Sequence, residues 1–266
     1  MEELANEIRK DLIKLHNRTH TSHIGSEFSS VDIMVELYYE IMKTDHSRAD
    51  FIDSDYFILS KGHAAPALYD ILYRRGFIGK EVFDSYGVNG TILAEHPNIE
   101  VKGVVCATGS LGHGLPIGSG IAYSLMKMKK SQRVFVLLSD GECQEGSTIE
   151  AANFAGRMKL DNLVAIVDNN GLQGFERTSN IQKIEAVHAK FSSSNWSVAE
   201  IDGHNYSEMK ESFSRIPLEA EKPSLFIANT VKGKGIKAME DRLEWHYRSP
   251  SDTNVDEFIK ELEVRR

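Results

Sequence analysis

The sequence predicts an α/β fold: a doubly wound, mostly parallel sheet with helices on both faces. Two short, continuous apolar runs at residues 134–138 and 163–167 are rich in β-branched side chains, which is typical of strands buried on both faces. Stretches with helical periodicity alternate with such runs along the chain, and this alternation indicates a parallel sheet. A chain of 266 residues can bury a sizeable core. We therefore expect a single domain over residues 1–266.

The expected elements follow from periodicity and from residues that begin or end helices. Helices are expected at residues 3–16, 31–42, 64–75, 115–128, 145–158, 207–216 and 254–264. Strands are expected at residues 56–59, 104–107, 134–139, 163–168, 197–201 and 224–230. Residues 231–250 are expected to form a loop with short structure beside the functional site, and the chain contains no internal repeat or linker.

Individual residues justify several of these bounds. The first helix has an apolar stripe formed by Leu4, Ile8, Leu12 and Leu15. Ser29 and Ser30 are N-cap candidates for the second helix, and Gly76 marks the end of the third. The helix at 115–128 is rich in small residues, which favour close approach to a strand or to a helix of a second subunit.

Composition excludes several classes of function. The net charge of −8 argues against broad nucleic-acid binding, which needs a basic face. Only two cysteines, Cys106 and Cys143, are present, too few for a disulfide framework or a zinc site. The N-terminus has no apolar signal core, and no run is long enough to cross a bilayer. A cytoplasmic location is expected, because a reducing setting is the default for such cysteine usage.

Polar residues follow the two most apolar strands. Asp140 and Gly141 come directly after the run at 134–138, and Asn169 and Asn170 follow the run at 163–167. Open α/β sheets bind ligands at the carboxyl ends of their strands, and hard oxygen ligands there suit a divalent cation that holds a diphosphate. Taken singly, each pair is better interpreted as an ordinary turn. Together, at a spacing of thirty residues, they favour a metal site.

This pattern is similar to the thiamine diphosphate-binding motif, and residues 139–172 resemble transketolases throughout. Further segments resemble transketolase motifs in the order of that family: residues 21–25, 59–64, 95–97 and 108–114. The resemblance covers most of the chain from about His16 to Pro250. It implies thiamine diphosphate as cofactor and Mg²⁺ as metal, with Ca²⁺ or Mn²⁺ as substitutes. The implied metal ligands are Asp140, Asn170 and the backbone carbonyl of Leu172.

The same resemblance implies cofactor contacts and catalytic groups. Cofactor-binding residues would be His63, Gly109, Leu111, Gly112, His113, Asp140, Gly141, Glu142, Asn170 and His246. Leu111 would lie against the aminopyrimidine, and His113 replaces a glutamine of many relatives. Gly141 would let the backbone approach phosphate closely. For Gly109, Gly112 and Gly114, a plain strand-to-helix turn is the alternative interpretation.

Ten histidines are present, and five lie in the family-like segments. The resemblance implies that His63 and His246 reach the diphosphate and the reacting centre, whereas His23 and His96 contact substrate. The other five are expected at the surface or at helix ends: His16, His20, His46, His188 and His204.

One acidic residue and one basic segment can each be interpreted in two ways. Glu145 matches a family glutamate that contacts another subunit near the cofactor; an acid at a helix N-terminus is also favoured by the helix dipole. Lys232, Lys234 and Lys237 precede Trp245-His246, and we expect a solvated loop there rather than phosphate contacts.

The family places its catalytic glutamate in a separate pyrimidine-binding domain, for which this chain has no room. Met1 and the closing helix resemble natural ends, so we expect an N-terminal subunit of a split transketolase. A second polypeptide would carry the pyrimidine-binding domain and the glutamate in an α2β2 assembly.

The implied reaction transfers a two-carbon ketol unit from a ketose, such as a sugar phosphate or a related anionic sugar, to an aldose. Tyr247 and Arg248 replace a glycine-containing segment of many split relatives, which suggests a donor with a modified anionic terminus. Alternatives are an α-type subunit of a 2-keto-acid dehydrogenase, a 1-deoxyxylulose-5-phosphate synthase-like enzyme, and a non-catalytic cofactor-binding subunit.

Overall fold

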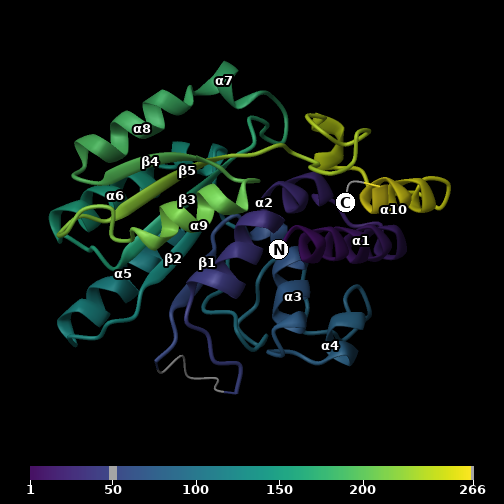
Figure 1. The fold of residues 1–266 in the computed structure, drawn as a ribbon, viewed down its shortest axis with the longest axis horizontal. Helices are drawn as coiled ribbons and strands as arrows, with labels where there is room; N and C mark the ends of the chain where they lie inside the picture. Colours follow the sequence, from purple (N-terminus) through teal and green to yellow (C-terminus); the bar gives the residue numbers. More distant parts are fainter. Residues whose placement is uncertain (48–52, 265–266) are drawn as a thin grey trace.

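A computed structural model describes residues 1–47 and 53–264. Its centre is a five-stranded, wholly parallel sheet with the strand order β1-β2-β3-β5-β4 (Figure 1). The strands are β1 Tyr56–Leu59, β2 Val134–Ser139, β3 Leu163–Asn169, β4 Ser197–Asp202 and β5 Ser224–Asn229. Helices cover both faces of this sheet. The predicted fold class is therefore confirmed.

The direction of chain travel decides which face each helix covers. From β1 to β4 the chain moves across the sheet in one direction, and α5 (Gly114–Lys127), α6 (Gly146–Arg157) and α8 (Ile184–Ser193) share one core cluster. The step from β4 back to β5 reverses that direction. Right-handed crossovers then require α9 (Tyr206–Ser214) to lie on the opposite face, where it packs in the other cluster.

Alternate residues of each strand enter the two clusters. Along β2, Val134 and Val136 pack toward α5 and α6, whereas Phe135 and Leu137 pack toward the opposite face. Every residue of β2 is buried. This accounts for a strand that is continuously apolar rather than alternating.

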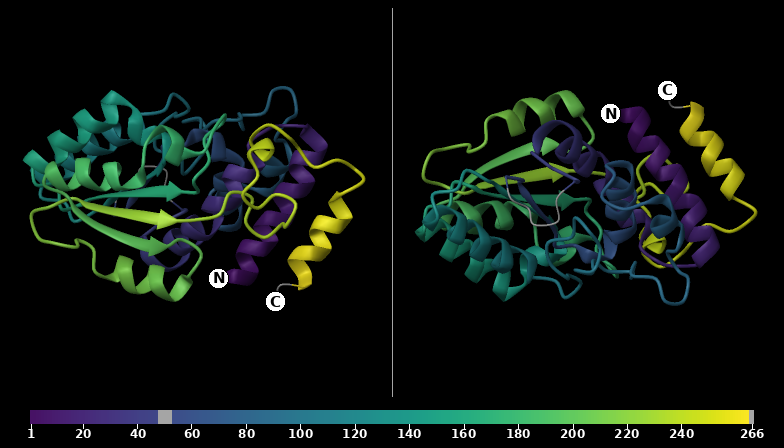
Figure 2. Two further views of the ribbon diagram at one scale, coloured as in Figure 1. Left: turned by 90° about the horizontal axis from the view of Figure 1, so that it is seen from above. Right: turned by 90° about the horizontal axis from the view of Figure 1, so that it is seen from below.

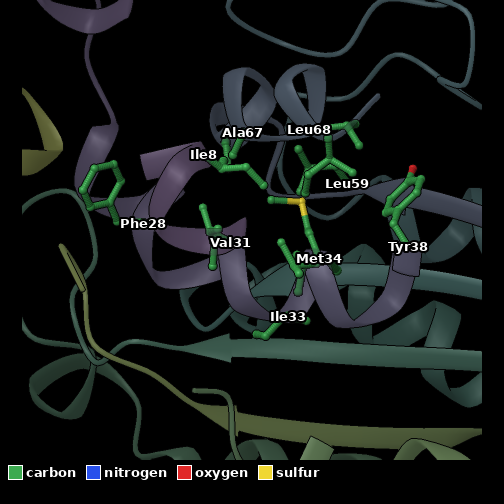
Figure 3. Close-up of a cluster of buried hydrophobic side chains, with 14 of the residues drawn as sticks. Ile8, Phe28, Val31, Ile33, Met34, Tyr38, Leu59, Ala67 and Leu68 are labelled. Carbon is green, nitrogen blue, oxygen red and sulfur yellow. The ribbon is translucent and has the colours of Figure 1, made fainter. Parts of the chain in front are cut away.

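The N-terminal helices form the second layer. α1 (Glu2–Thr19) packs on α2 (Ile24–Glu36), which continues as a π-helical turn at Leu37–Ile41. Figure 3 shows the apolar side chains of α2 meeting those of α1, α3 and β1. The start expected for α2 was wrong. Ser29 and Ser30 lie inside the helix, where their buried hydroxyls donate to the carbonyl of Ser26, so they do not cap it.

The segment between β1 and β2 differs from expectation in one respect. Gly62–Ala64 forms a 3₁₀ turn that leads into α3 (Ala65–Arg74), and a short α4 (Lys80–Asp84) follows. The strand expected at residues 104–107 is absent from the described structure. Val104 donates its N–H to the carbonyl of Val101 at 3.0 Å in a turn. An apolar run becomes a strand only beside a strand that it can pair with.

Two short helices and a long connection complete the chain. α7 (Thr178–Ile181) follows β3, and α10 (Val255–Val264) lies beside α1, as both views of Figure 2 show. Between β5 and α10 the chain crosses the carboxyl ends of the strands and contains a 3₁₀ turn at Leu243–His246. None of the described helices is long and apolar enough to cross a membrane.

Gly156 is a position where packing forbids any side chain. It lies within α6, and a Cβ there would overlap the backbone carbonyl oxygen of Ser194 at the end of α8. We expect Gly156→Ala to lower the free energy of unfolding by about 1–3 kcal/mol, the usual cost of overpacking. Thermal or urea unfolding of the isolated chain measures this.

Gly120→Ala in α5 is the matched control, because a Cβ there meets nothing within 4 Å. Alanine is a better helix former than glycine, so this variant is expected to gain about 0.5–1 kcal/mol. Equal stability of the two variants would contradict the close contact of α6 with the end of α8.

Candidate functional site

Asp140 and the residues after β3 meet at the carboxyl edge of the sheet. The Asp140 carboxylate accepts hydrogen bonds from Gly141 N at 2.7 Å, Gly171 N at 3.1 Å and Thr178 Oγ1 at 2.6 Å. Burial raises the pKa of Asp140, although the Thr178 hydroxyl opposes this. One carboxylate thus joins the end of β2 to the loop that follows β3.

Asn170 and Leu172 lie in the same network. Asn170 Oδ1 accepts from Leu172 N at 3.1 Å, and Asn170 Nδ2 donates to Ser29 Oγ and Asp168 Oδ2, each at 3.3 Å. The Leu172 carbonyl accepts from Lys232 Nζ at 3.3 Å. The three residues expected to bind metal are therefore buried together. No group of three or more His, Cys, Asp or Glu able to hold a metal occurs within the described residues, so any cation here would depend on mixed oxygen donors.

A cavity of about 350 Å³ opens above these residues. Its walls include Ser26, His63, Leu111, Asp140, Gly141, Gln144, Glu145, Asn170, Leu172, Gln173 and His246. Phe175 also lines it, although its side chain is 74% exposed. The amide nitrogens Nε2 of Gln144 and Gln173 are buried in this wall, and neither has a hydrogen-bond partner within the described structure. A polar cavity with unused N–H donors suits an anion.

Four of the histidines expected at the site gather beside the cavity. The His23 ring centroid lies 4.8 Å from that of His246, 5.3 Å from that of His63 and 6.5 Å from that of His96. The ring centroids of His63 and His246 are 5.8 Å apart. The backbone adds a link, because His23 N donates to the His246 carbonyl at 3.0 Å. Segments far apart in sequence thus form one imidazole cluster.

Burial keeps three of these imidazoles, those of His23, His63 and His246, neutral. It lowers the pKa of His23 to about 4, with His96 adding to the effect. It lowers the pKa of His246 to about 3, with the Lys232 ammonium adding. The pKa of His63 is well below its usual range because of burial and the charge of Lys61. At neutral pH each of these three rings can accept one hydrogen bond and donate another.

Lys61 and Asp168 form a buried ion pair that the sequence motifs did not indicate. Both side chains are fully buried, and Lys61 Nζ also donates to the Ser26 carbonyl at 2.8 Å. Burial by itself raises the pKa of Asp168, but Lys61 and the hydroxyls of Ser29 and Thr230 hold it below its usual value. The available signal was a charged residue at the carboxyl end of an apolar run: Lys61 follows Leu59 after one serine, and Asp168 comes directly after Val167.

The expectation of a solvated loop was wrong for Lys232. Its side chain is 1% exposed, and Nζ lies 2.9 Å from His246 Nδ1 in addition to its bond with Leu172. Burial and the neighbouring Lys61 lower the pKa of Lys232 to about 8. Lys237 is exposed as expected.

Gly109 and Gly112 shape the wall without lining it. Gly112 has φ +85° and donates its N–H to Glu142 Oε1 at 2.8 Å; Gly109 has φ +143° and lies against the His96 ring. Glu142 is fully buried and also accepts from Ser60 Oγ and Ser139 N, so it faces protein groups rather than the cavity. A side chain at Gly114 would overlap Ser60, so packing accounts for that glycine.

Other expected residues lie at the edge or elsewhere. His113 is exposed, and its Nδ1 lies 3.1 Å from the Ser110 carbonyl. Glu145 is exposed at the cavity wall, directly before α6. His16 and His204 were expected at the surface or at helix ends; both lie near a helix end, but neither side chain is at the surface. His16 is fully buried against Glu27, and His204 contacts the buried Asp32 at 2.6 Å.

Comparison with known proteins agrees with this geometry. A family model described as transketolase, thiamine diphosphate binding domain, matches residues 1–264. The chain is 37% identical to an apulose-4-phosphate transketolase subunit of Phocaeicola vulgatus, covering 97% of this chain and 92% of that protein. It is 33% identical to the 6-deoxy-6-sulfo-D-fructose transketolase subunit SqwG of a Clostridium species, covering 97% and 94%.

Solved structures show the same fold. The transketolase of Campylobacter jejuni superimposes with a TM-score of 0.90 at 27% identity, over 99% of this chain. This chain spans only 42% of that longer protein, in contrast to the subunits above. The family match, the buried acidic edge and the histidine cluster coincide, and the chain belongs to the transketolase family through its thiamine diphosphate-binding domain.

Proposed function

We propose that this chain is the thiamine diphosphate-binding subunit of a two-chain transketolase and that residues 1–266 act as one domain. The observation that carries this proposal is the cavity that joins Asp140 and Asn170 to the neutral histidine cluster. Two relatives that this chain covers to 92% and 94% of their length are named as subunits of transketolases, which supports the proposal.

The residues present fit a metal-bound diphosphate. Asp140, Asn170 and the Leu172 carbonyl would hold Mg²⁺, because this ion prefers oxygen ligands and retains phosphate oxygens. Gln144 and Gln173 would supply the buried N–H donors that otherwise have no partner. Gly141 has no side chain, and a Cβ at this position would lie 3.1 Å from Gln173 Cδ. The bare backbone would be able to approach a phosphate closely. Once bound, the cofactor supplies the electron sink for the two-carbon unit.

The histidines would handle protons and sugar hydroxyls. His63 and His246 line the cavity and would contact the diphosphate and the reacting centre. His23 and His96 belong to the same cluster without lining the cavity, and they would contact the sugar. Because their surroundings keep the rings of His23, His63 and His246 neutral, these imidazoles would accept and donate hydrogen bonds without adding charge.

A second polypeptide would complete the site. We propose that it carries a pyrimidine-binding domain with the catalytic glutamate and that two copies of each chain assemble. Glu145 supports this, because it is exposed at the cavity wall where a partner would cover it. The named relatives are all transketolase proteins, so a keto-acid dehydrogenase chain or a 1-deoxyxylulose-5-phosphate synthase-like enzyme gains no support from them.

Co-purification from the source cells tests the assembly. We expect a stoichiometric partner with a pyrimidine-type domain, and the reconstituted pair is expected to transfer a ketol unit from a ketose phosphate or sulfonate to an aldose. A mixture that instead oxidises pyruvate with an electron acceptor would refute the proposal, and so would a pair that binds cofactor but transfers no ketol unit.

Asp140→Ala is expected to weaken binding of Mg²⁺ and thiamine diphosphate by at least about 100-fold, because it removes the carboxylate from the ligand set. Calorimetric titration of the reconstituted protein measures this. Asp256→Asn, an exposed acid on α10, is the control and is expected to bind as wild type. Unchanged affinity of Asp140→Ala would place the metal elsewhere.

Lys232→Met is expected to act in opposite directions on stability and on binding. Because folding lowers the pKa of Lys232 to about 8, the charged form of this residue destabilises the folded chain, and it does so fully below pH 8. Methionine carries no charge, so the melting temperature without ligand is expected to stay the same or to rise. Affinity for thiamine diphosphate is expected to fall about 10- to 100-fold, since a buried cation near the diphosphate is lost.

Lys234→Met, in the same segment, is the control for both measurements. A Lys232→Met protein that melts earlier and binds cofactor normally would show that Lys232 is a structural group only.

Arg248→Ala tests whether the site prefers a donor sugar with an anionic terminus. Arg248 and Tyr247 are exposed just beyond His246, and a guanidinium there would attract an anionic sugar terminus. The KM for a phosphorylated or sulfonated ketose is expected to rise about tenfold, while that for an uncharged ketose stays constant. The exposed Arg242→Ala is the control; equal changes for both kinds of donor would remove the anion-binding role.

A further inference from the structure

The turn that carries His23 has an unusual backbone. α1 ends at Thr19 and α2 begins at Ile24, and the short turn between them contains two non-glycine residues with left-handed conformations. His20 has φ +54° and His23 has φ +79°. Such conformations cost about 1–3 kcal/mol each and persist only where surrounding contacts hold them.

A buried side-chain pair spans this turn. His16, in the last turn of α1, places Nε2 at 2.9 Å from both carboxylate oxygens of Glu27 in the first turn of α2. Both side chains have an exposed fraction of 0%. The pair therefore links the two helices that flank the turn with the strained residues.

The other nitrogen of His16 reaches the turn itself. His16 Nδ1 lies 3.0 Å from the Thr21 carbonyl oxygen. Thr21 Oγ1 lies at the same distance of 3.0 Å from Nδ1. The Thr19 hydroxyl donates to the Leu15 carbonyl, so the Thr21 hydroxyl donates to Thr19 Oγ1 at 2.9 Å. Both Thr21 oxygens are then acceptors toward His16, and Nδ1 carries the proton and donates. Nε2 then either donates to the Glu27 carboxylate or accepts from its protonated form, and in both cases Glu27 fixes the ring orientation. His16 thus holds the backbone two residues before His23.

The end of the turn nearer α2 is hydrogen-bonded to the loop that carries His246. His23 N donates to the His246 carbonyl at 3.0 Å, and the His23 carbonyl accepts from Ser26 N at 2.8 Å. With Thr21 fixed from one side and His246 from the other, the His23 ring is held 4.8 Å from the His246 ring.

We propose that His16 and Glu27 form a positioning pair, in which the bond from His16 Nδ1 to Thr21 keeps His23 in the histidine cluster. Neither residue lines the cavity, so they act through His23 rather than on substrate. The structural part of this inference stands on the turn alone. Its consequence for turnover rests on the proposed function.

Isosteric amides separate the two bonds of His16. An asparagine places its amide nitrogen near the position of Nδ1, whereas a glutamine reaches the position of Nε2. Each substitution of His16 is combined with Glu27→Gln in a double variant. Removal of His16 alone would leave a buried, unpaired carboxylate at Glu27 and endanger folding. Glu27→Gln alone is the matched control: it can donate to Nε2 of neutral His16 and leaves the Thr21 bond in place.

Histidine NMR of the isolated chain is the readout, with the His23 signal assigned through His23→Gln. In the wild type the pKa of His23 is lowered to about 4 by burial and by His96, with smaller effects from His16, Lys232 and Lys61. Glu27→Gln also removes the charge of His16, so it reports any purely electrostatic change. We expect Glu27→Gln and His16→Asn/Glu27→Gln to keep His23 untitrated above pH 5, and His16→Gln/Glu27→Gln to shift its pKa toward the usual value of about 6.5.

The inference is overturned if His23 stays untitrated in His16→Gln/Glu27→Gln, or if it is released equally in His16→Asn/Glu27→Gln. Circular dichroism confirms that each variant is folded. In the reconstituted enzyme, His16→Gln/Glu27→Gln is expected to lower donor kcat/KM about tenfold or more, with unchanged thiamine diphosphate affinity. Because the NMR experiment needs neither partner nor cofactor, its result stands whether or not the proposed function is correct.

Discussion

The buried ion pair of Lys61 and Asp168 is the interaction on which the site depends. Lys61 follows β1 and Asp168 lies near the end of β3, so the pair bridges across β2, and Thr230 joins it from just beyond β5. Through the Ser26 carbonyl and the Ser29 hydroxyl it also holds α2. A buried pair of this kind contributes little net stability, yet loss of one partner costs about 3–5 kcal/mol. Its value here is geometric: it fixes the elements that carry the cavity.

The polar groups around the cavity are arranged for a ligand rather than for the empty protein. Lys232 is charged against the preference of its surroundings, and the two glutamine amides have no partner within the described structure. Such groups lower the stability of the free chain, and a bound anion would pair with the Lys232 charge and with the two amides. The neutral histidines beside them add donors and acceptors without adding charge. The free chain is thus less stable than its core would allow, because the site is preorganised.

Sequence patterns predicted the sheet well and the site only in part. β1 and β2 were placed correctly, because a short, uninterrupted apolar run of this kind fits few structures except a buried strand. Residues 104–107 looked the same but lacked a strand to pair with, which no local pattern reveals. The three residues expected to bind metal lie together in the structure, and so do four of the histidines expected at the site. Lys232 was misjudged, because a Lys-Gly-Lys-Gly segment resembles a flexible loop, whereas its path is set by the contact of Gly233 N with the Gly25 carbonyl, far away in sequence.

The late insertion of β5 between β3 and β4 bears on how the chain is made. β4 pairs only with β5 among the described strands, and β3 has an open side until β5 arrives. During synthesis from the N-terminus, the sheet therefore cannot close before residue 229 has left the ribosome. Until then, β3 and β4 present unpaired edges of the kind that promote aggregation. The sheet is consequently completed only once β5 is available, and early intermediates depend on α1, α2 and the β1–β2–β3 half for protection.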